Sequence, residues 1–158
     1  MKQISILTLL LLFLGCTNND NKTIRKSRNE KQFKPTGHNA MAPYVIAENP
    51  ESLVNFLVNT FDAQELNRYS HTDGSILHIE LLIDDSILML SAANVQQPAT
   101  KSYIHVYVPN AQETFELAIR NGAEPVVEPV IDEGDTDMRG VFKDFSGNVW
   151  AIATHTAQ

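Results

Sequence analysis

The chain of 158 residues contains a single cysteine, Cys16, and this scarcity excludes several arrangements at once. One cysteine cannot form a disulfide within the chain, so the folded part must be stabilised by its hydrophobic core. The paired cysteines that build structural zinc sites are also missing. The sequence lacks a glycine-rich phosphate-binding loop and the glycine–serine turn that exposes a serine nucleophile. Neither P-loop nucleotide binding nor serine hydrolysis is therefore indicated.

Basic residues are scarce from Met41 onward, where five of them stand against 17 acidic residues. The five are Arg68, Lys101, Arg120, Arg139 and Lys143. Nucleic-acid binding requires clustered Lys and Arg side chains that contact phosphates. We therefore expect no nucleic-acid partner for this part of the chain.

No apolar run reaches the roughly 20 residues that a permanent membrane helix needs. Instead, Lys2 is followed by a short apolar run over residues 4–14 and then by Gly15 and Cys16. A basic start, a short apolar stretch and a small residue before a cut site predict a secretory signal. An ordinary signal peptide that is cut elsewhere is the alternative.

The segment Phe13-Leu14-Gly15-Cys16 resembles the lipobox of bacterial lipoproteins, although that class usually has Leu where Phe13 stands. The resemblance implies that residues 1–16 are a lipoprotein signal peptide and that Cys16 carries the lipid. It also implies an extracytoplasmic protein that is lipid-anchored to a membrane of the bacterial cell envelope.

Residues 17–40 carry six basic and two acidic side chains and show no apolar periodicity. Such a polar segment cannot bury enough apolar surface to fold, so it predicts a disordered tether. Its positive charge would favour an anionic membrane surface beside the anchor. Residues 41–158 then have the length of one domain.

The first half of this domain predicts a strand, a helix and three more strands. Residues 43–47 form a short apolar run. Asn49 can cap a helix whose first position is Pro50, where the missing N–H costs nothing, and apolar residues recur at helical spacing up to Phe61. Strands are expected at residues 65–69, 76–83 and 87–90.

The second half repeats this order. A strand is expected at residues 103–108, followed by a helix that Asn110 caps, with Glu113 as in a capping box and Gly122 at its end. Three further strands are expected at residues 125–131, 140–143 and 149–154. The acidic run at residues 132–137 lacks the full calcium-loop pattern and is interpreted as a solvated loop.

A strand, a capped helix and three strands thus occur twice, about 60 residues apart, which indicates an internal duplication. Each half alone would leave one sheet face uncovered. We predict an α+β fold of two βαβββ modules, at about residues 42–92 and 102–155, that form curved mixed sheets around a shared cavity.

Several stretches, taken in this order, resemble the vicinal oxygen chelate superfamily, which includes glyoxalase I, bleomycin-resistance proteins and extradiol dioxygenases. Within this superfamily the sequence looks most like the PhnB-like branch, and the resemblance extends over residues 42–155. The matching stretches are Pro43-Tyr44-Val45, Leu77-His78-Ile79-Glu80-Leu81, residues 85–91, Ile104-His105-Val106-Tyr107-Val108 and residues 144–155. The resemblance implies a glyoxalase-like domain that binds a small molecule.

The resemblance also implies four positions for ligands of a divalent metal. They fall at Ala42 or Pro43, at Glu80, near Tyr103 and at Ala151. Alanine and proline side chains cannot bind a metal, so the usual ligand set is largely missing.

A rearranged site is an alternative, because strand alternation puts His78 with Glu80 and Tyr103 with His105 on the inward faces of two strands. Two histidines and a carboxylate can hold Zn, Fe or Mn, and we take Glu80 and His105 as the candidate metal ligands. The other interpretation is a polar ligand cavity in which these four side chains bond to each other and to water. A register slip of one residue would turn all of them to the other face.

Other polar or aromatic residues are weaker candidates. Trp150 is expected to pack under a helix, and Arg139 to form an ion pair with an acidic residue. His155 is expected at the surface near a strand end, with cavity lining as its alternative. His38 falls in the tether, and His71 in a solvated turn.

The favoured function is a membrane-anchored small-molecule-binding protein of this superfamily, with a homodimer as a further partner. One alternative is a lyase, isomerase or dioxygenase in which a metal acts as a Lewis acid on the substrate. Another is an envelope module that binds a protein partner through its outer surface. The fold alone cannot choose among these functions, because function depends on the site.

Overall fold

The fold is seen in a computed structural model that describes residues 33–156. The predicted signal peptide, Cys16 and most of the predicted tether lie outside the described residues. The compact unit begins at Lys34, so residues 34–40, which the sequence assigned to the tether, are part of it. In the described part of the chain, no helix has the length and apolar character needed to cross a membrane.

The first module is a four-stranded sheet with one helix. Its elements are β1 (Tyr44–Ala47), α1 (Pro50–Phe61), β2 (Gln64–Ser70), β3 (Ile76–Ile83) and β4 (Ser86–Ala92). The strand order is β1-β4-β3-β2, with β1 parallel to β4 and the other neighbours antiparallel. The predicted order of elements in this half is confirmed.

Local signals set the limits of α1. The side chain of Asn49 accepts a hydrogen bond from the backbone N–H of Ser52 at 3.1 Å, and Pro50 follows the cap as predicted. The helix ends at Asp62, whose φ of 54° lies in the left-handed region. Aspartate tolerates this region better than most residues other than glycine.

The second module has the same topology. Its elements are β5 (Tyr103–Tyr107), α2 (Ala111–Arg120), β6 (Glu124–Ile131), β7 (Asp137–Lys143) and β8 (Val149–His155), and its strand order is β5-β8-β7-β6. The two-module α+β fold is confirmed. Several strand ends differ from the prediction by one or two residues, and the largest error is at β7, which begins at Asp137 rather than at Gly140 because Asp137 pairs with His155 at the end of β8.

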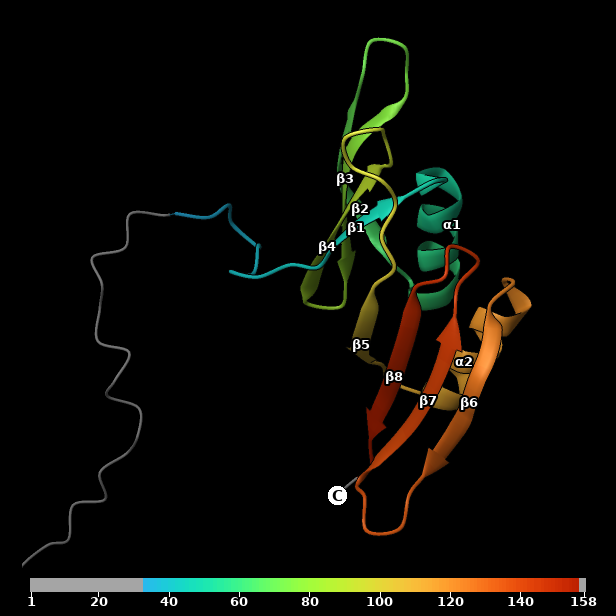
Figure 1. Cartoon of the computed structure of the whole chain (residues 1–158). Coiled ribbons are helices and arrows are strands. Elements are labelled where there is room, and N and C mark those ends of the chain that lie inside the picture. The colour runs from blue at the N-terminus through green and yellow to red at the C-terminus, as the bar shows by residue number, and fades with distance from the viewer. Residues whose placement is uncertain (1–32, 157–158) are drawn as a thin grey trace, which may run out of the picture. The chain divides into compact units, whose positions relative to one another are not determined.

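The two modules share one hydrophobic core. Figure 1 shows α1 and α2 next to each other, and the side chain of Asn121 joins them by donating to Thr60 at 3.3 Å. The ring of Phe61 in α1 lies 5.2 Å from that of Trp150 in β8. The expectation that Trp150 packs under a helix is therefore confirmed, although the helix belongs to the other module.

A buried carboxylate closes the turn between β7 and β8. Asp144 accepts from the backbone N–H groups of Ser146 and Asn148 through Oδ1, and from Asn148 Nδ2 and Trp150 Nε1 through Oδ2, at 2.8 to 3.0 Å. All four bonds fall within a seven-residue stretch. This part of the resemblance to the superfamily is thus a structural turn.

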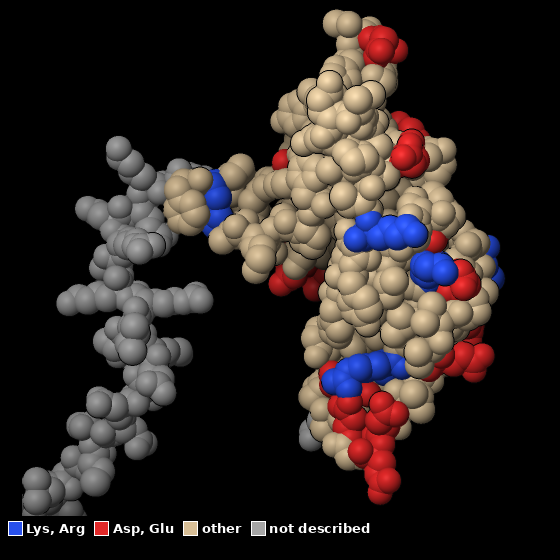
Figure 2. Space-filling model, in the orientation of Figure 1, with Lys and Arg blue, Asp and Glu red and all other residues tan. Residues whose placement is uncertain are grey.

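Each sheet has one face that its helix does not cover. Exposed aromatic side chains on these open faces include Tyr44 and Tyr69 in the first module and Tyr103 and Tyr107 in the second. In Figure 2 the face turned to the viewer is mostly uncharged, and acidic side chains gather at the end where β6 turns into β7. The open faces are thus available for a ligand or a partner.

Candidate functional site

A cleft of about 910 Å³ lies at the junction of the two modules, and we call it the intermodule cleft. Residues 58–62 at the end of α1 and Leu82 near the end of β3 contribute one wall. Residues 107–110, which lead into α2, and His155 at the end of β8 contribute the other. The cleft is therefore lined by residues of both modules.

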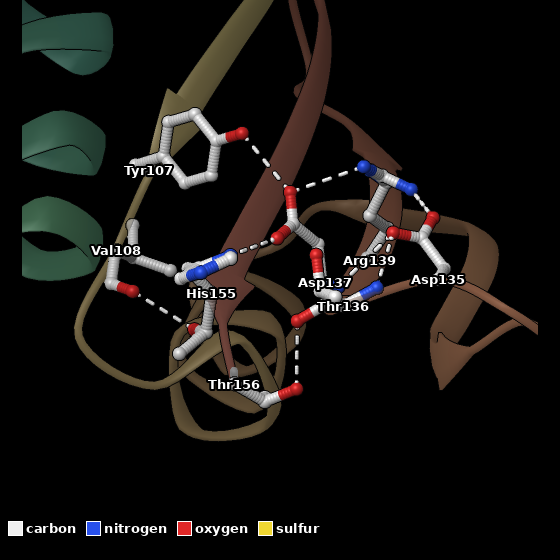
Figure 3. Close-up of polar contacts among 9 residues, drawn as sticks. Tyr107, Val108, Asp135, Thr136, Asp137, Arg139, His155 and Thr156 are labelled. Atoms are coloured by element: carbon white, nitrogen blue, oxygen red, sulfur yellow. Dashed lines mark hydrogen bonds and ion pairs between the residues drawn. The ribbon is translucent and has the colours of Figure 1, made fainter. Parts of the chain in front are cut away.

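Four polar side chains from three neighbouring strands meet at the rim of this cleft, and we call them the Asp137 network (Figure 3). Asp137 Oδ1 bonds to His155 Nδ1 at 2.7 Å. Asp137 Oδ2 accepts from the hydroxyl of Tyr107 and from Nη2 of Arg139, each at 3.0 Å. Arg139 also forms an ion pair with Asp135, so the expected ion pair of Arg139 is confirmed.

Strand register explains why these residues meet. Asp137 lies opposite His155, and Arg139 lies opposite Ala153, which also pairs with Tyr107 on the other side of β8. Paired positions place their side chains on the same face of a sheet. The network is therefore built into the open face of the second sheet.

The charges within the network follow from these bonds. The side chain of Asp137 is only 5% exposed. The hydrogen bond from His155 lowers the pKa of this carboxyl, with a smaller contribution from Tyr107, and burial acts in the opposite direction. In turn, the bond to the Asp137 carboxylate raises the pKa of the Tyr107 hydroxyl. Because an ionised carboxylate can only accept, His155 must carry its proton on Nδ1.

A second hollow, of about 300 Å³, adjoins the cleft. Residues 83–88, at the turn between β3 and β4, line it together with His105 of β5 and with Met41 from the segment before β1. Tyr107 and Asp84 line both hollows. The predicted cavity residue His105 thus faces a hollow, and its ring lies 4.9 Å from that of Tyr107.

Glu80 and His78 lie on the open face of the first sheet, as strand alternation predicted. Glu80 Oε2 bonds to Asn67 Nδ2 at 2.5 Å and to His38 Nε2 at 3.1 Å, and Oε1 lies 3.5 Å from His78 Nε2. The bond from Asn67 lowers the pKa of the Glu80 carboxyl; burial opposes this, and the two histidines add to the lowering. His38, which the sequence assigned to the tether, is thus part of the domain.

The predicted set of four cavity residues is divided between the two sheets. The structure brings His78 and Glu80 together, with the ring of Tyr44 stacked on His78 at 5.7 Å. Tyr103 and His105 belong to β5 in the other sheet, and Tyr103 is 71% exposed. A cavity lined by all four residues stays a prediction.

A metal site formed by Glu80 and His105 stays a prediction. The two residues come from different sheets, as the two-module prediction implies, and the Glu80 carboxylate is bonded to His38, Asn67 and His78. Within residues 33–156, no three Cys, His, Asp or Glu side chains are placed so that they could share a metal ion. We derive no chemistry through a metal from this arrangement.

The sequence interpretation missed the Asp137 network, because it placed Asp137 in a solvated loop. The sequence did contain a signal for it, because the turn at Asp144 fixes the register between β7 and β8. That register determines which residues pair at every position further from the turn. Extending that hairpin outward would have placed Asp137 opposite His155. Tyr107, in turn, shows its role only in the register between β5 and β8.

Comparison with solved structures shows the class of fold. TioX from a Micromonospora species aligns with a TM-score of 0.61 at 20% identity, covering 76% of this chain and 98% of that one. FosX from Listeria monocytogenes, complexed with Mn(II) and sulfate, aligns at 0.57 and 17% identity, covering 75% and 93%. A glyoxalase/bleomycin resistance protein/dioxygenase family enzyme from Burkholderia phytofirmans aligns at 0.55 and 16%, covering 71% and 94%. The chain therefore has the glyoxalase/bleomycin-resistance/dioxygenase fold, that of the vicinal oxygen chelate superfamily.

Comparison of sequences places the chain in a narrower group. No protein-family model matches it. Uncharacterized protein Mb0911c of Mycobacterium bovis is 30% identical over 124 residues, covering 72% of this chain and 81% of that protein. Uncharacterized protein Rv0887c of Mycobacterium tuberculosis is also 30% identical over 124 residues, covering 72% of each. The chain belongs to the same family as these mycobacterial proteins.

Proposed function

We propose that the protein is a membrane-anchored small-molecule-binding protein and that its ligand occupies the intermodule cleft. The observation that carries this proposal is the cleft itself, about 910 Å³ in volume and lined by both modules. Small-molecule sites commonly have volumes of roughly 300 to 1,000 Å³ and combine apolar walls with a few placed polar groups. Val58, Phe61 and Leu117 supply apolar walls, and Tyr107 and His155 of the Asp137 network supply placed polar groups.

A cleft-filling variant tests this proposal. Ligand-observed NMR with a library of small organic fragments should detect binders to the purified full chain. Val58→Trp places a large ring in the cleft and should abolish binding of most of them, whereas Val95→Trp, at a 95% exposed loop position outside the cleft, should not. Fragments that bind both variants equally well would show that the ligand site lies elsewhere.

The lipid anchor is the second part of the proposal. Its support is the lipobox-like segment ending at Cys16 and the basic character of residues 17–40. In a bacterial host, the native chain should incorporate labelled palmitate and fractionate with membranes. Cys16→Ala should lose the label and remain unprocessed or leave the membrane. A mutant that is labelled and fractionated like the native chain would refute the anchor.

A homodimer is the partner that the open sheet faces support. Tyr44, Tyr69, Tyr103 and Tyr107 are all between 47% and 71% exposed on these faces. A second copy could cover this apolar surface, which would otherwise stay in contact with water. Light scattering coupled to gel filtration should give twice the chain mass, and a monomer at high micromolar concentration would exclude this part of the proposal.

A metal-dependent enzyme is the competing function, because FosX, which shares the fold, was crystallised with Mn(II). Metal analysis of the full chain, purified without chelators, separates the two functions. About one equivalent of a divalent metal, lost in Glu80→Gln, would favour the enzyme.

A further inference from the structure

We infer that the intermodule cleft selects ligands that carry a protonated amine on an apolar or aromatic body, and that Nε2 of His155 accepts one of the amine N–H bonds. The inference rests on the proposed binding function of the cleft and names the class of ligand. Three independent features of the cleft support it: the orientation of His155, the charges of the lining, and its apolar wall.

The Asp137 network fixes which nitrogen of His155 is free. Nδ1 bonds to the ionised carboxylate of Asp137 at 2.7 Å and therefore carries a proton. The second ring nitrogen, Nε2, lies on the far side of the imidazole ring, and Figure 3 shows the ring turned with one nitrogen towards Asp137. In the neutral imidazole Nε2 is then an acceptor. Since His155 lines the cleft, this acceptor is available to a ligand that donates a hydrogen bond.

The charges of the lining decide which donor is favoured. Three acidic residues, Asp62, Asp84 and Glu113, line the cleft. Among the described residues that form its lining there is no lysine or arginine. The nearby Arg139 is already paired with Asp135 and Asp137. A cleft lined by charges of one sign raises the local concentration of ligands of the opposite sign. A cationic donor therefore fits better than a neutral one, and an anion is repelled.

The remaining wall describes the rest of the ligand. Phe61 and Leu117, from the two helices, line the cleft together with Leu82 of β3. These side chains gain hydrophobic free energy when a hydrocarbon or aromatic group covers them. A small inorganic cation would leave this wall in contact with water. An aromatic amine satisfies all three features.

Three indole compounds of similar shape test the inference. Tryptamine is a cation at neutral pH, tryptophol is neutral and donates through a hydroxyl, and indole-3-acetate is an anion. Isothermal titration of the full chain should show tryptamine binding about tenfold more tightly than tryptophol. Indole-3-acetate should bind most weakly. The preference for tryptamine should shrink as salt is added, because salt screens the lining carboxylates.

Variants separate the role of charge from that of His155. Asp62 and Asp84 both have positive φ, 54° and 50°, and asparagine tolerates this conformation as aspartate does. Asp62→Asn with Asp84→Asn should therefore fold normally, weaken tryptamine about fivefold or more and leave tryptophol almost unchanged. His155→Phe should weaken both donors about tenfold, the loss of one hydrogen bond. The control His71→Phe, at an exposed histidine outside the cleft, should change neither.

The outcomes distinguish this inference from the proposed function. If tryptophol or indole-3-acetate binds in the cleft as tightly as tryptamine, the binding function stands and the amine class is refuted. Tryptamine binding that is unaffected by the double aspartate variant or by His155→Phe also refutes the inference. If fragments bind in the cleft but none of the three indoles does, the amine class is likewise refuted. Failure of every fragment and every indole refutes the binding function itself.

Discussion

We predict that Asp144→Asn strongly destabilises the fold, although it replaces only one carboxylate oxygen by an NH₂ group. The native carboxylate receives four hydrogen bonds, two on each oxygen, from donors at 2.8 to 3.0 Å. An asparagine retains one acceptor oxygen and presents an NH₂ group in place of the other. Whichever way the amide is turned, two of the four donors then face another donor.

The magnitude follows from the burial of these donors. Asn148 and Trp150 are both 0% exposed, so water cannot replace the lost acceptor. Leaving a buried donor unpaired costs about 1 to 3 kcal/mol. With two donors affected, we expect the free energy of unfolding to fall by about 2 to 5 kcal/mol.

Trp150 makes the measurement direct, since it is the single tryptophan of the chain and one of the four donors. Its fluorescence should follow urea unfolding, with a midpoint that is lower in Asp144→Asn while the slope is unchanged. Asp132→Asn, at an exposed position, is the matched control and should stay within about 0.5 kcal/mol of the native chain. A loss below 1 kcal/mol in Asp144→Asn would refute the reasoning.

Three further predictions concern stability. Because the pKa of Asp137 is lowered in the fold, its ionised form contributes stability that is complete above the ordinary aspartate pKa of about 3.9 and is lost as the pH falls below it; urea midpoints between pH 3 and 7 should fall less steeply with acid in Asp137→Asn. Gly140→Ala would place a Cβ 2.9 Å from the stiff ring of Pro129 and should cost about 1 to 3 kcal/mol by urea unfolding, whereas an unchanged midpoint would show that β6 moves freely. Chains starting at Lys34 and at Met41 should both melt cooperatively, the second slightly earlier because it lacks the His38–Glu80 contact; an aggregated Met41 chain would show that residues 34–40 are essential for folding.

The order of elements was predictable because its signals are local. The start of each helix is indicated by a short motif, Asn49 with Pro50 in α1 and Asn110 with Glu113 in α2. Both asparagines cap their helices as predicted. Over a window of local sequence, apolar periodicity distinguishes an amphipathic helix from a half-buried strand. The duplicated pattern then leads to the two-module fold without any knowledge of long-range contacts.

Features that depend on distant partners were harder to predict. His38 has polar neighbours in the sequence, and it is partly buried by a contact with Glu80, 42 residues further along the chain. Asp137 lies in an acidic run, and only its pairing with His155 shows that it is buried. Local composition describes both residues as solvated, whereas a distant side chain partly buries His38 and the sheet register buries Asp137.

The predicted cavity residues also depend on contacts that are distant in the sequence. Alternation correctly placed His78 with Glu80, because two residues apart on one strand share a face. It could not decide whether that face opposes the face of His105, since this depends on how the two sheets are held. The packing of Phe61 against Trp150 and of Phe56 against Phe142 across the modules determines it.

Different residues of this chain maintain the fold and form the candidate site, so the fold can be kept while the site differs from the metal site of the superfamily. One of the segments that resemble the superfamily, residues 144–155, begins with the Asp144 turn and continues into β8, so this part of the likeness is structural. Positions where the resemblance implies metal ligands hold Ala42, Pro43 and Ala151 instead. The polar groups of this chain gather further along the same sheet face, where Asp137 meets His155 at the rim of the cleft. A ligand site built from that network would need the fold to position it but not the metal ligands of the superfamily, which is why the amine and metal experiments together discriminate between the two functions.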